Sequence, residues 1–316
     1  MIFNLRIVAA LFSASSVLAQ IPPAKVYTSD FNSSFSLTLA QIEAAELDEA
    51  TVDSLNIVLR YDRSQLAFGG PYEDDFYALP PLTGPLQAGQ VLKVQDVTDA
   101  SAYSIPAGTA LSRILYTTQN LNGTVIPTSG FILWPYAPRR FESDAPDSKA
   151  HVVVWAHGTS GFFRTQNPSS QRPLWYAHNA PFALALAGYA VFAPDFAGLG
   201  VSESWDGSEI PHEYNASPAQ ARDSLYGFRA AKKAFPDYLG GDFVVIGHSQ
   251  GGGTAWGVAE ALAAEEETFA DLQEGYKGSI PVSPTTVLFE SSPDFVIPPV
   301  ALGLHQASPA SRSTNG

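Results

Sequence analysis

Cysteine is absent from this 316-residue chain, methionine occurs once, and basic residues are scarce. Without cysteine, the protein can form no disulfide, no thiol nucleophile and no cysteine-ligated zinc site. Its 17 Lys and Arg residues are outnumbered by 31 Asp and Glu residues, which gives a net charge of −14. A chain with no basic cluster is a poor match for nucleic acids and for anionic membranes.

Long hydrophobic runs are also lacking. The N-terminus carries Arg6, a short apolar stretch over residues 7–12 and small residues up to Ala19. This pattern predicts a signal peptide over residues 1–19, because the apolar stretch is far below the ~20 residues that span a membrane. We therefore expect a secreted, extracellular protein with no integral membrane association. Three N-x-S/T triplets are candidate glycosylation sites that fit this route: Asn32, Asn122 and Asn215.

The sequence does contain enough apolar material for a large core, with 45% hydrophobic residues and 12% aromatics. Helical spacing of apolar residues predicts a helix over residues 39–61. A stretch rich in proline and glycine follows over residues 68–90, and we interpret it as an ordered arm on the core. Two strands are then predicted, joined near Asn122-Gly123 as a hairpin.

Beyond the hairpin, short apolar strands alternate with helices. The strands are in "AHVVVWAHGTSG" (150–161), "GYAVFAPDFAGLG" (188–200), "DFVVIG" (242–247) and "GSIPVSP" (278–284). Helices are predicted over 173–187, from 217 to about 235 with Ser217 as N-cap and Pro218 at its first position, and after Gly251. This alternation predicts an α/β fold with a mostly parallel central sheet and helices on both faces.

One motif carries the chemistry. Residues 247–251 read Gly-His-Ser-Gln-Gly, directly after an apolar strand and before a helix. G-x-S-x-G in that context is typical of a nucleophilic serine on a sharp strand-to-helix turn, where the flanking glycines leave room for the turn. The alternative is a glycine-rich turn with an incidental serine. We take Ser249 as the candidate nucleophile.

An oxyanion site is expected beside Ser249. The backbone N–H of Gln250 opens the helix, and a second donor is expected from the loop after an earlier strand. In "WAHGTSG" this donor is Gly158 or Thr159, and we expect His157 to shape the loop rather than act as the base. His248 is expected to pack against the sheet.

Other polar residues are given supporting roles or none. Asp195 precedes the serine, so it is predicted to cap or form a turn rather than serve as the catalytic acid. His178 and His212 are isolated in sequence, and no metal site is predicted. "GLG" and "GGG" lack the spacing of a dinucleotide motif, so no cofactor is predicted.

The base and the acid are harder to place. After Ser249 the sequence holds one histidine, His305, and the preceding carboxylates are Glu290 and Asp294. In sheets of this kind the acid and the histidine come from separate loops after later strands, whereas Asp294 and His305 are eleven positions apart. His305 is therefore a poor candidate base, and we expect a truncated hydrolase.

Several blocks together resemble the fungal secretory lipase family, lipase A type, of the α/β-hydrolases. They are "EDDFYALPPLTGPLQAGQVLKVQDV", "IPAGTALSRILYTTQNLNGTVIPTSGFILWP", "VVVWAHGTSG", "LALAGYAVFAPDFAGLG" and "IGHSQGGG", which span about residues 70–260. The resemblance implies a secreted carboxylic-ester hydrolase (a lipase or esterase) that acts on acyl esters or acylglycerols. It also implies Ser249 as nucleophile, Gln250 at one oxyanion position, and the other within residues 157–159.

The resemblance sets the expected domain organisation. A signal peptide (1–19) precedes an N-terminal extension packed on the core (20–95), a partial α/β-hydrolase core (96–283), and the start of a cap or a disordered tail (284–316). Two features depart from the family, which commonly carries disulfides and continues past this length. The C-terminal part of the sheet and the cap are therefore expected to be missing.

Two other functions stay open. The chain could be a truncated or non-catalytic member of the fold that keeps the turn at Ser249 but lacks the triad Asp and His. It could also be a serine peptidase on the same fold. The partner expected is a small-molecule or lipid ester, with contact to a lipid interface and the oligomeric state left open.

Overall fold

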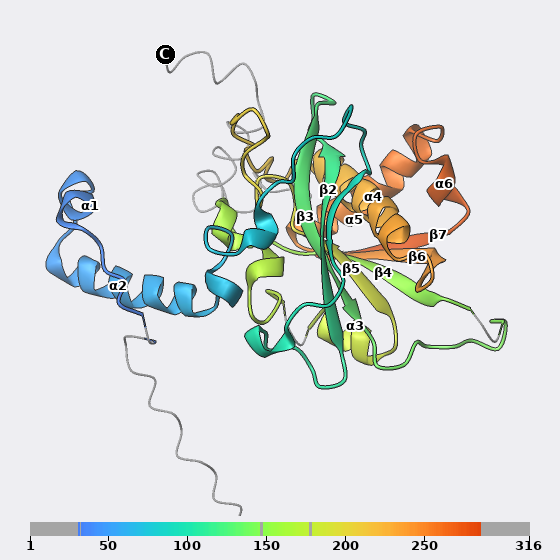
Figure 1. Cartoon of the computed structure of the whole chain (residues 1–316), viewed down its shortest axis with the longest axis horizontal. Helices are drawn as coiled ribbons and strands as arrows, with labels where there is room; N and C mark the ends of the chain where they lie inside the picture. The colour runs from blue at the N-terminus through green and yellow to red at the C-terminus, as the bar shows by residue number, and fades with distance from the viewer. Residues whose placement is uncertain (1–30, 32, 146–147, 177–178, 286–316) are drawn as a thin grey trace, which may run out of the picture. The chain divides into compact units, whose positions relative to one another are not determined.

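The computed structural model describes residues 31, 33–145, 148–176 and 179–285 (Figure 1). The chain divides into two compact units, Met1–Ser64 and Gln65–Gly316. The domain boundaries expected at residues 19, 95 and 283 stay predictions. Within the described residues, no helix is long and apolar enough to cross a membrane.

The described part of the first unit contains two helices where the sequence predicted one. They are α1 (Leu39–Ala44) and α2 (Glu49–Ser64), and none of their residues is buried. Thr38 and Gln41 form a capping box at the start of α1, and Glu46 lies in the left-handed region at φ 52°. That conformation ends a helix, so the prediction of one continuous helix over 39–61 is wrong in its middle.

Seven strands form one sheet in the described part of the second unit, in the order β1-β2-β3-β5-β4-β6-β7. The strands are β1 (Val91–Gln95), β2 (Ala110–Gln119), β3 (Val125–Trp134), β4 (Ala150–Ala156), β5 (Ala190–Pro194), β6 (Leu239–His248) and β7 (Tyr276–Val282). Pairing is antiparallel from β1 to β5 and parallel across β5, β4, β6 and β7. The predicted α/β-hydrolase sheet is confirmed, with its parallel strands at the centre and on the β7 side.

The predicted hairpin is confirmed residue by residue. β2 and β3 pair without a register shift from Ala110 opposite Trp134 to Gln119 opposite Val125. Residues 120–124 close the hairpin, and Gly123 adopts φ +77°, which glycine reaches without a steric penalty. This hairpin connects the arm and β1 to the central strands.

The α-helices in the described residues of the second unit are α3 (Phe182–Leu186), α4 (Ser217–Ala234), α5 (Gln250–Ala264) and α6 (Ala270–Gln273). Five short 3-10 turns precede or connect them: Ala67–Gly69, Asp75–Tyr77, Ala100–Ala102, Arg164–Gln166 and Pro168–Ser170.

Two helix predictions need correction. The helix expected over 173–187 is reduced to α3, because Leu174 and Trp175 have positive φ and Pro181 interrupts the segment. Ser217 is the first residue of α4 and not its N-cap, a position held by Ala216 without a side-chain cap. The Ser217 hydroxyl instead faces α5, since a Cβ on Gly253 would lie 3.1 Å from it.

The hydrophobic core has one layer on each face of the sheet. α4 and α5 pack on one face, where Phe228 and Val258 meet Val152 and Val154 of β4. α3 lies on the other face, where Phe182 packs with Trp155. Residues of β4 thus alternate between the two layers, as strand geometry requires. Because side chains pack on both faces of the sheet, the carboxyl ends of its parallel strands are held in fixed positions.

Candidate active site

Ser249 occupies the turn between β6 and α5. β6 ends at His248 and α5 begins at Gln250, so Ser249 is the one residue between strand and helix. Its backbone has φ 55° and ψ −117°, a conformation that costs a non-glycine residue free energy. The Ser249 N–H donates to the Val282 carbonyl of β7 at 2.9 Å. These contacts hold the serine at the carboxyl end of the parallel strands, where ligands bind in such sheets.

The two glycines that flank the serine are required by close backbone contacts. A Cβ on Gly247 would lie 1.9 Å from the Gly251 carbonyl oxygen. A Cβ on Gly251 would lie 2.0 Å from the Ala156 carbonyl oxygen of β4. Any side chain at either position would push α5 away from the strands. Glycine at both positions therefore permits the strained turn at Ser249.

The turn and the loop after β4 lie side by side. Ala156 pairs with Gly247 in the parallel ladder, so residues 157–159 begin beside the turn. Gln250 is the first residue of α5, whose first-turn N–H groups have no acceptor within the helix. Its N–H is therefore available to an anion, and the helix dipole favours negative charge there.

The two candidates for the second donor differ in their surroundings. Thr159 is exposed, and its hydroxyl lies 2.9 Å from the hydroxyl of Tyr214. Gly158 is buried under Tyr176, because a Cβ on Gly158 would lie 1.9 Å from the Tyr176 hydroxyl oxygen. Burial raises the pKa of Tyr176, and its hydrogen bonding with the Gly158 backbone acts in the opposite direction. The side of the loop open to a substrate is thus at Thr159.

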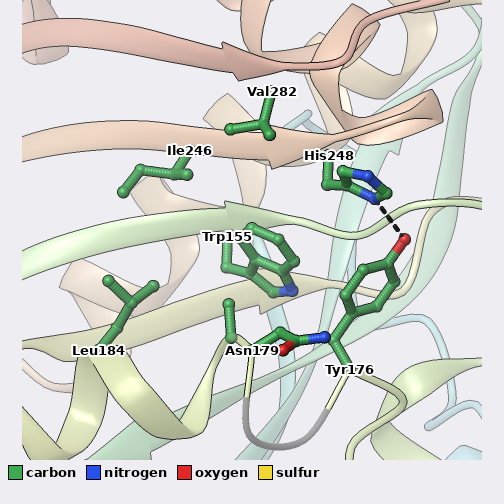
Figure 2. A pocket seen from close by; sticks show the side chains of 8 residues that line it. Trp155, Tyr176, Asn179, Leu184, Ile246, His248 and Val282 are labelled. Atoms are coloured by element: carbon green, nitrogen blue, oxygen red, sulfur yellow. Dashed lines mark hydrogen bonds between the residues drawn. The ribbon is translucent and has the colours of Figure 1, made fainter.

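Tyr176 also contacts His248, a pairing that the sequence did not suggest. The Tyr176 hydroxyl lies 2.8 Å from Nδ1 of His248, as the dashed line in Figure 2 shows. His248 is half-buried at the end of β6, and its ring contacts Tyr176 edge-on. The sequence predicted that His248 packs against the sheet. In the structure its ring nitrogen also binds the hydroxyl of Tyr176, which precedes α3.

Tyr176 and His248 both line a cavity of about 320 Å³, to which α3 contributes Leu184 (Figure 2). Its lining is mostly apolar and comprises Trp155, Tyr176, Asn179, Ala180, Leu184, Ile246, His248 and Val282. Ser249 and the candidate oxyanion residues Gly158, Thr159 and Gln250 are not among the lining residues.

His157 connects the loop after β4 to the loop after β5. It is 1% exposed, its Nδ1 donates to the Gly158 carbonyl at 2.7 Å, and its Nε2 lies 3.3 Å from the Asp195 carbonyl. The ring packs on Phe196 with centroids 4.3 Å apart. Burial lowers the pKa of His157. Its ring nitrogens therefore face carbonyl oxygens and not Ser249.

Asp195 binds the turn at residues 167–170 and strand β3, rather than its own turn. Its carboxylate is fully buried and accepts from the Ser169 N–H at 2.7 Å, from the Asn167 amide at 3.2 Å and from the hydroxyls of Ser129 and Ser169. These donors belong to β3 and to the 167–170 turn, far from Asp195 in sequence. Asp195 therefore links separate segments beneath the site.

His212 is isolated in sequence but not in space. It is buried, its Nδ1 lies 3.1 Å from the Ala197 carbonyl, and its Nε2 lies 3.1 Å from the side-chain nitrogen of Gln250. No cluster of three or more His, Asp or Glu side chains fit to hold a metal occurs among the described residues.

The base is not found among the described histidines. In residues 31, 33–145, 148–176 and 179–285, no histidine ring hydrogen-bonds to Ser249; the rings there belong to His151, His157, His212 and His248. His178, Glu290, Asp294 and His305 lie outside the described residues, as does Asn32.

The other two glycosylation candidates differ in access. Asn122 is exposed in the hairpin turn. The amide nitrogen of Asn215 is buried without a partner among the described residues, so the folded chain does not present it to solvent.

A serine in a strained turn between β6 and α5, at the carboxyl end of the parallel strands of a mixed sheet, is typical of the α/β-hydrolase class. The sequence profile of the alpha/beta hydrolase family matches residues 153–314, just over half of the chain. The chain therefore belongs to the alpha/beta hydrolase family. A search of curated protein sequences found no significant match.

Several solved structures are similar to parts of this chain. Candida antarctica lipase A is similar with a TM-score of 0.53 and 20% identity, over 78% of this chain and 56% of that chain. Its closed state gives a TM-score of 0.47 at 21% identity, over 66% and 45%. The rice cell wall degrading esterase LipA from Xanthomonas oryzae gives 0.43 at 21% identity, over 58% and 49%. The chain thus spans about half the length of these structures, and at such identity the likeness concerns the fold.

Proposed function

We propose that this protein is a serine carboxylic-ester hydrolase, a lipase or esterase, with Ser249 as its nucleophile. The observation that carries the proposal is the backbone of Ser249, strained at φ 55° and ψ −117° between two glycines that tolerate no side chain. Strain of this kind persists where the surroundings enforce it, and it is concentrated at functional sites. A serine held this way presents its hydroxyl at the end of the sheet.

The reaction has two steps. In the first, Oγ of Ser249 bonds to the ester carbonyl carbon, its proton passes to a general base, and the bond to the alcohol oxygen breaks as the alcohol takes that proton. In the second, water attacks the acyl-enzyme, and the acid leaves as the serine regains its proton. The N–H groups of Gln250 and of Thr159 or Gly158 stabilise the negative oxygen that forms in each step. His305 stays a poor candidate base, and it lies outside the described residues.

Acyl esters or acylglycerols are the proposed substrates, and the proposed location is outside the cell. The names of the similar structures, a lipase and an esterase, support the substrate class. The signal-peptide pattern of residues 1–19 supports secretion. The fungal secretory lipase family stays the proposed subgroup, on the motifs quoted above.

The test compares the 316-residue protein with Ser249→Ala on short- and long-chain p-nitrophenyl esters. Ser104→Ala, which changes an exposed serine, is the matched control. We expect Ser249→Ala to lose about 10³-fold or more in kcat and Ser104→Ala to retain the wild-type rate. Equal rates for wild type and Ser249→Ala would refute the proposal. Ser249-dependent cleavage of a peptide but not of esters would favour the peptidase.

A further inference from the structure

One short segment reaches both sides of the candidate oxyanion site. Residues 212–214 lie between β5 and α4 in the sequence. Nε2 of His212 is 3.1 Å from the side-chain nitrogen of Gln250, on the side of the serine turn. The hydroxyl of Tyr214 is 2.9 Å from Oγ1 of Thr159, on the side of the loop after β4. The two candidate oxyanion residues are thus bound by neighbours two positions apart.

The hydrogen bonds of His212 are compatible with one arrangement of its neutral ring. Nδ1 faces the Ala197 carbonyl oxygen at 3.1 Å, so it carries the proton and donates. Nε2 is therefore an acceptor, and the Gln250 amide must turn its N–H toward it. Burial lowers the pKa of His212 to about 4, so the ring is neutral near pH 7. The side chain of Gln250, itself 1% exposed, is held in one orientation.

The segment is itself firmly anchored. His212 binds the carbonyl oxygen of Ala197, and the N–H of the same residue donates to Asp223 of α4 at 2.9 Å. The Gln220 amide, also on α4, donates to the Glu213 carbonyl at 3.1 Å. A Cβ on Gly198 would lie 2.3 Å from the backbone nitrogen of His212, so the two loops are in direct contact. Contacts with α4 and with the loop after β5 therefore hold residues 212–214 in place. His212 and Tyr214 thus meet Gln250 and Thr159 from fixed positions.

The ring of Tyr214 adds a contact with the same loop. It packs edge-on against Phe162, with centroids 4.8 Å apart. Phe162 follows the 157–161 stretch that carries Thr159. The hydroxyl and the ring of Tyr214 therefore bind the loop at two points, and the hydroxyl bond can be removed without loss of the ring contact.

We propose that His212 and Tyr214 are positioning residues that set the spacing between the N–H of Gln250 and the N–H of Thr159. The inference rests on the proposed function, because the spacing matters only if both donors bind the oxyanion. Oxyanion donors act when they are preorganised around the position where charge develops. Loosening either contact is therefore expected to lower kcat more than it changes KM.

The first arm of the test is kinetic. Tyr214→Phe should lower kcat on a p-nitrophenyl ester about 2- to 10-fold with KM nearly unchanged, the effect of one neutral hydrogen bond. Thr159→Val removes the other partner and should give a similar loss. The double variant should be no slower than either single variant, because both remove the same bond. Tyr136→Phe, at a tyrosine that is 88% exposed, is the matched control and should behave as wild type.

The second arm does not depend on turnover. Amide hydrogen exchange of residues 157–161 should be faster in Tyr214→Phe than in wild type, while exchange in α4 stays unchanged. Unchanged exchange in the loop would overturn the inference, and so would faster exchange with an unchanged kcat. Absence of Ser249-dependent hydrolysis would count against the proposed function, whereas the exchange measurement would still decide whether residues 212–214 hold the loop.

Discussion

Gly251, two residues after Ser249, is the position where we expect a single substitution to disturb the candidate site strongly. In Gly251→Ala the new Cβ would lie 2.0 Å from the Ala156 carbonyl oxygen and 2.6 Å from that of His157. An ordinary contact needs about 3.4 Å or more, so the start of α5 must move by more than 1 Å. Both oxygens belong to the backbone, one in β4 and one in the loop after it. They cannot move aside as the end of a flexible side chain could.

Overpacking of this kind costs about 1–3 kcal/mol in the free energy of unfolding. The same shift separates Gln250 from the loop after β4, so a Ser249-dependent rate should fall about 10²-fold or more. Gly241→Ala is the matched control, because a Cβ at this position of β6 meets no atom within 4 Å. It should leave the stability unchanged or raise it by up to about 1 kcal/mol. Urea unfolding that gives equal stabilities for the two variants would refute the packing argument.

Two further predictions concern buried carboxyl groups. Asp195→Ala leaves the donors of Ser129, Asn167 and Ser169 buried without their acceptor, and should lower the free energy of unfolding by about 3 kcal/mol or more. Urea unfolding checks this loss, and a loss no larger than that of Asp237→Ala, at an exposed position, would contradict it. Burial raises the pKa of Asp223 to about 7, so the folded state favours its protonated form and wild-type stability falls as the pH rises from about 4 to about 7. Asp223→Asn removes this dependence, so urea titrations should show its stability relative to wild type rising by about 4 kcal/mol over that range; a difference that does not vary with pH would exclude the raised pKa.

Local sequence was enough to predict the central part of the fold. The hairpin at Asn122-Gly123, the strands at β4 to β7 and the turn at Ser249 each carry their signal within a few residues. Glycines on both sides of the serine are a signal of the same kind, since the clash that excludes a side chain arises within the motif and from the adjacent strand. Such features depend on backbone geometry, which short sequences encode well.

The contacts that the sequence did not predict join residues far apart in the chain. His212 and Gln250 are 38 positions apart, and Tyr176 and His248 are 72 apart. Neither pair follows a helical or strand period, so no sequence pattern marks it. The sequence also did not show which segments Asp195 binds, because its partners, 26 to 66 positions away, meet it only in the folded chain.

The helix errors have a related cause. Alanine and leucine in residues 182–187 favour helix, yet the positive φ of Leu174 and Trp175 keeps the preceding residues out of it. Ser217 before Pro218 matches the usual N-cap signal, but the packing of its side chain against α5 places it inside the helix. Tertiary packing overrode local preference in both cases.

Covalent trapping tests the central claim, that Ser249 is an activated nucleophile, most directly. A fluorophosphonate ester reacts with nucleophilic serines and leaves a stable phosphonyl group, which intact-mass analysis and peptide mapping can locate. We expect one adduct per chain on the peptide that contains Ser249, and none on Ser249→Ala treated in the same way. An unmodified wild-type chain, or equal modification of the two proteins, would contradict the account.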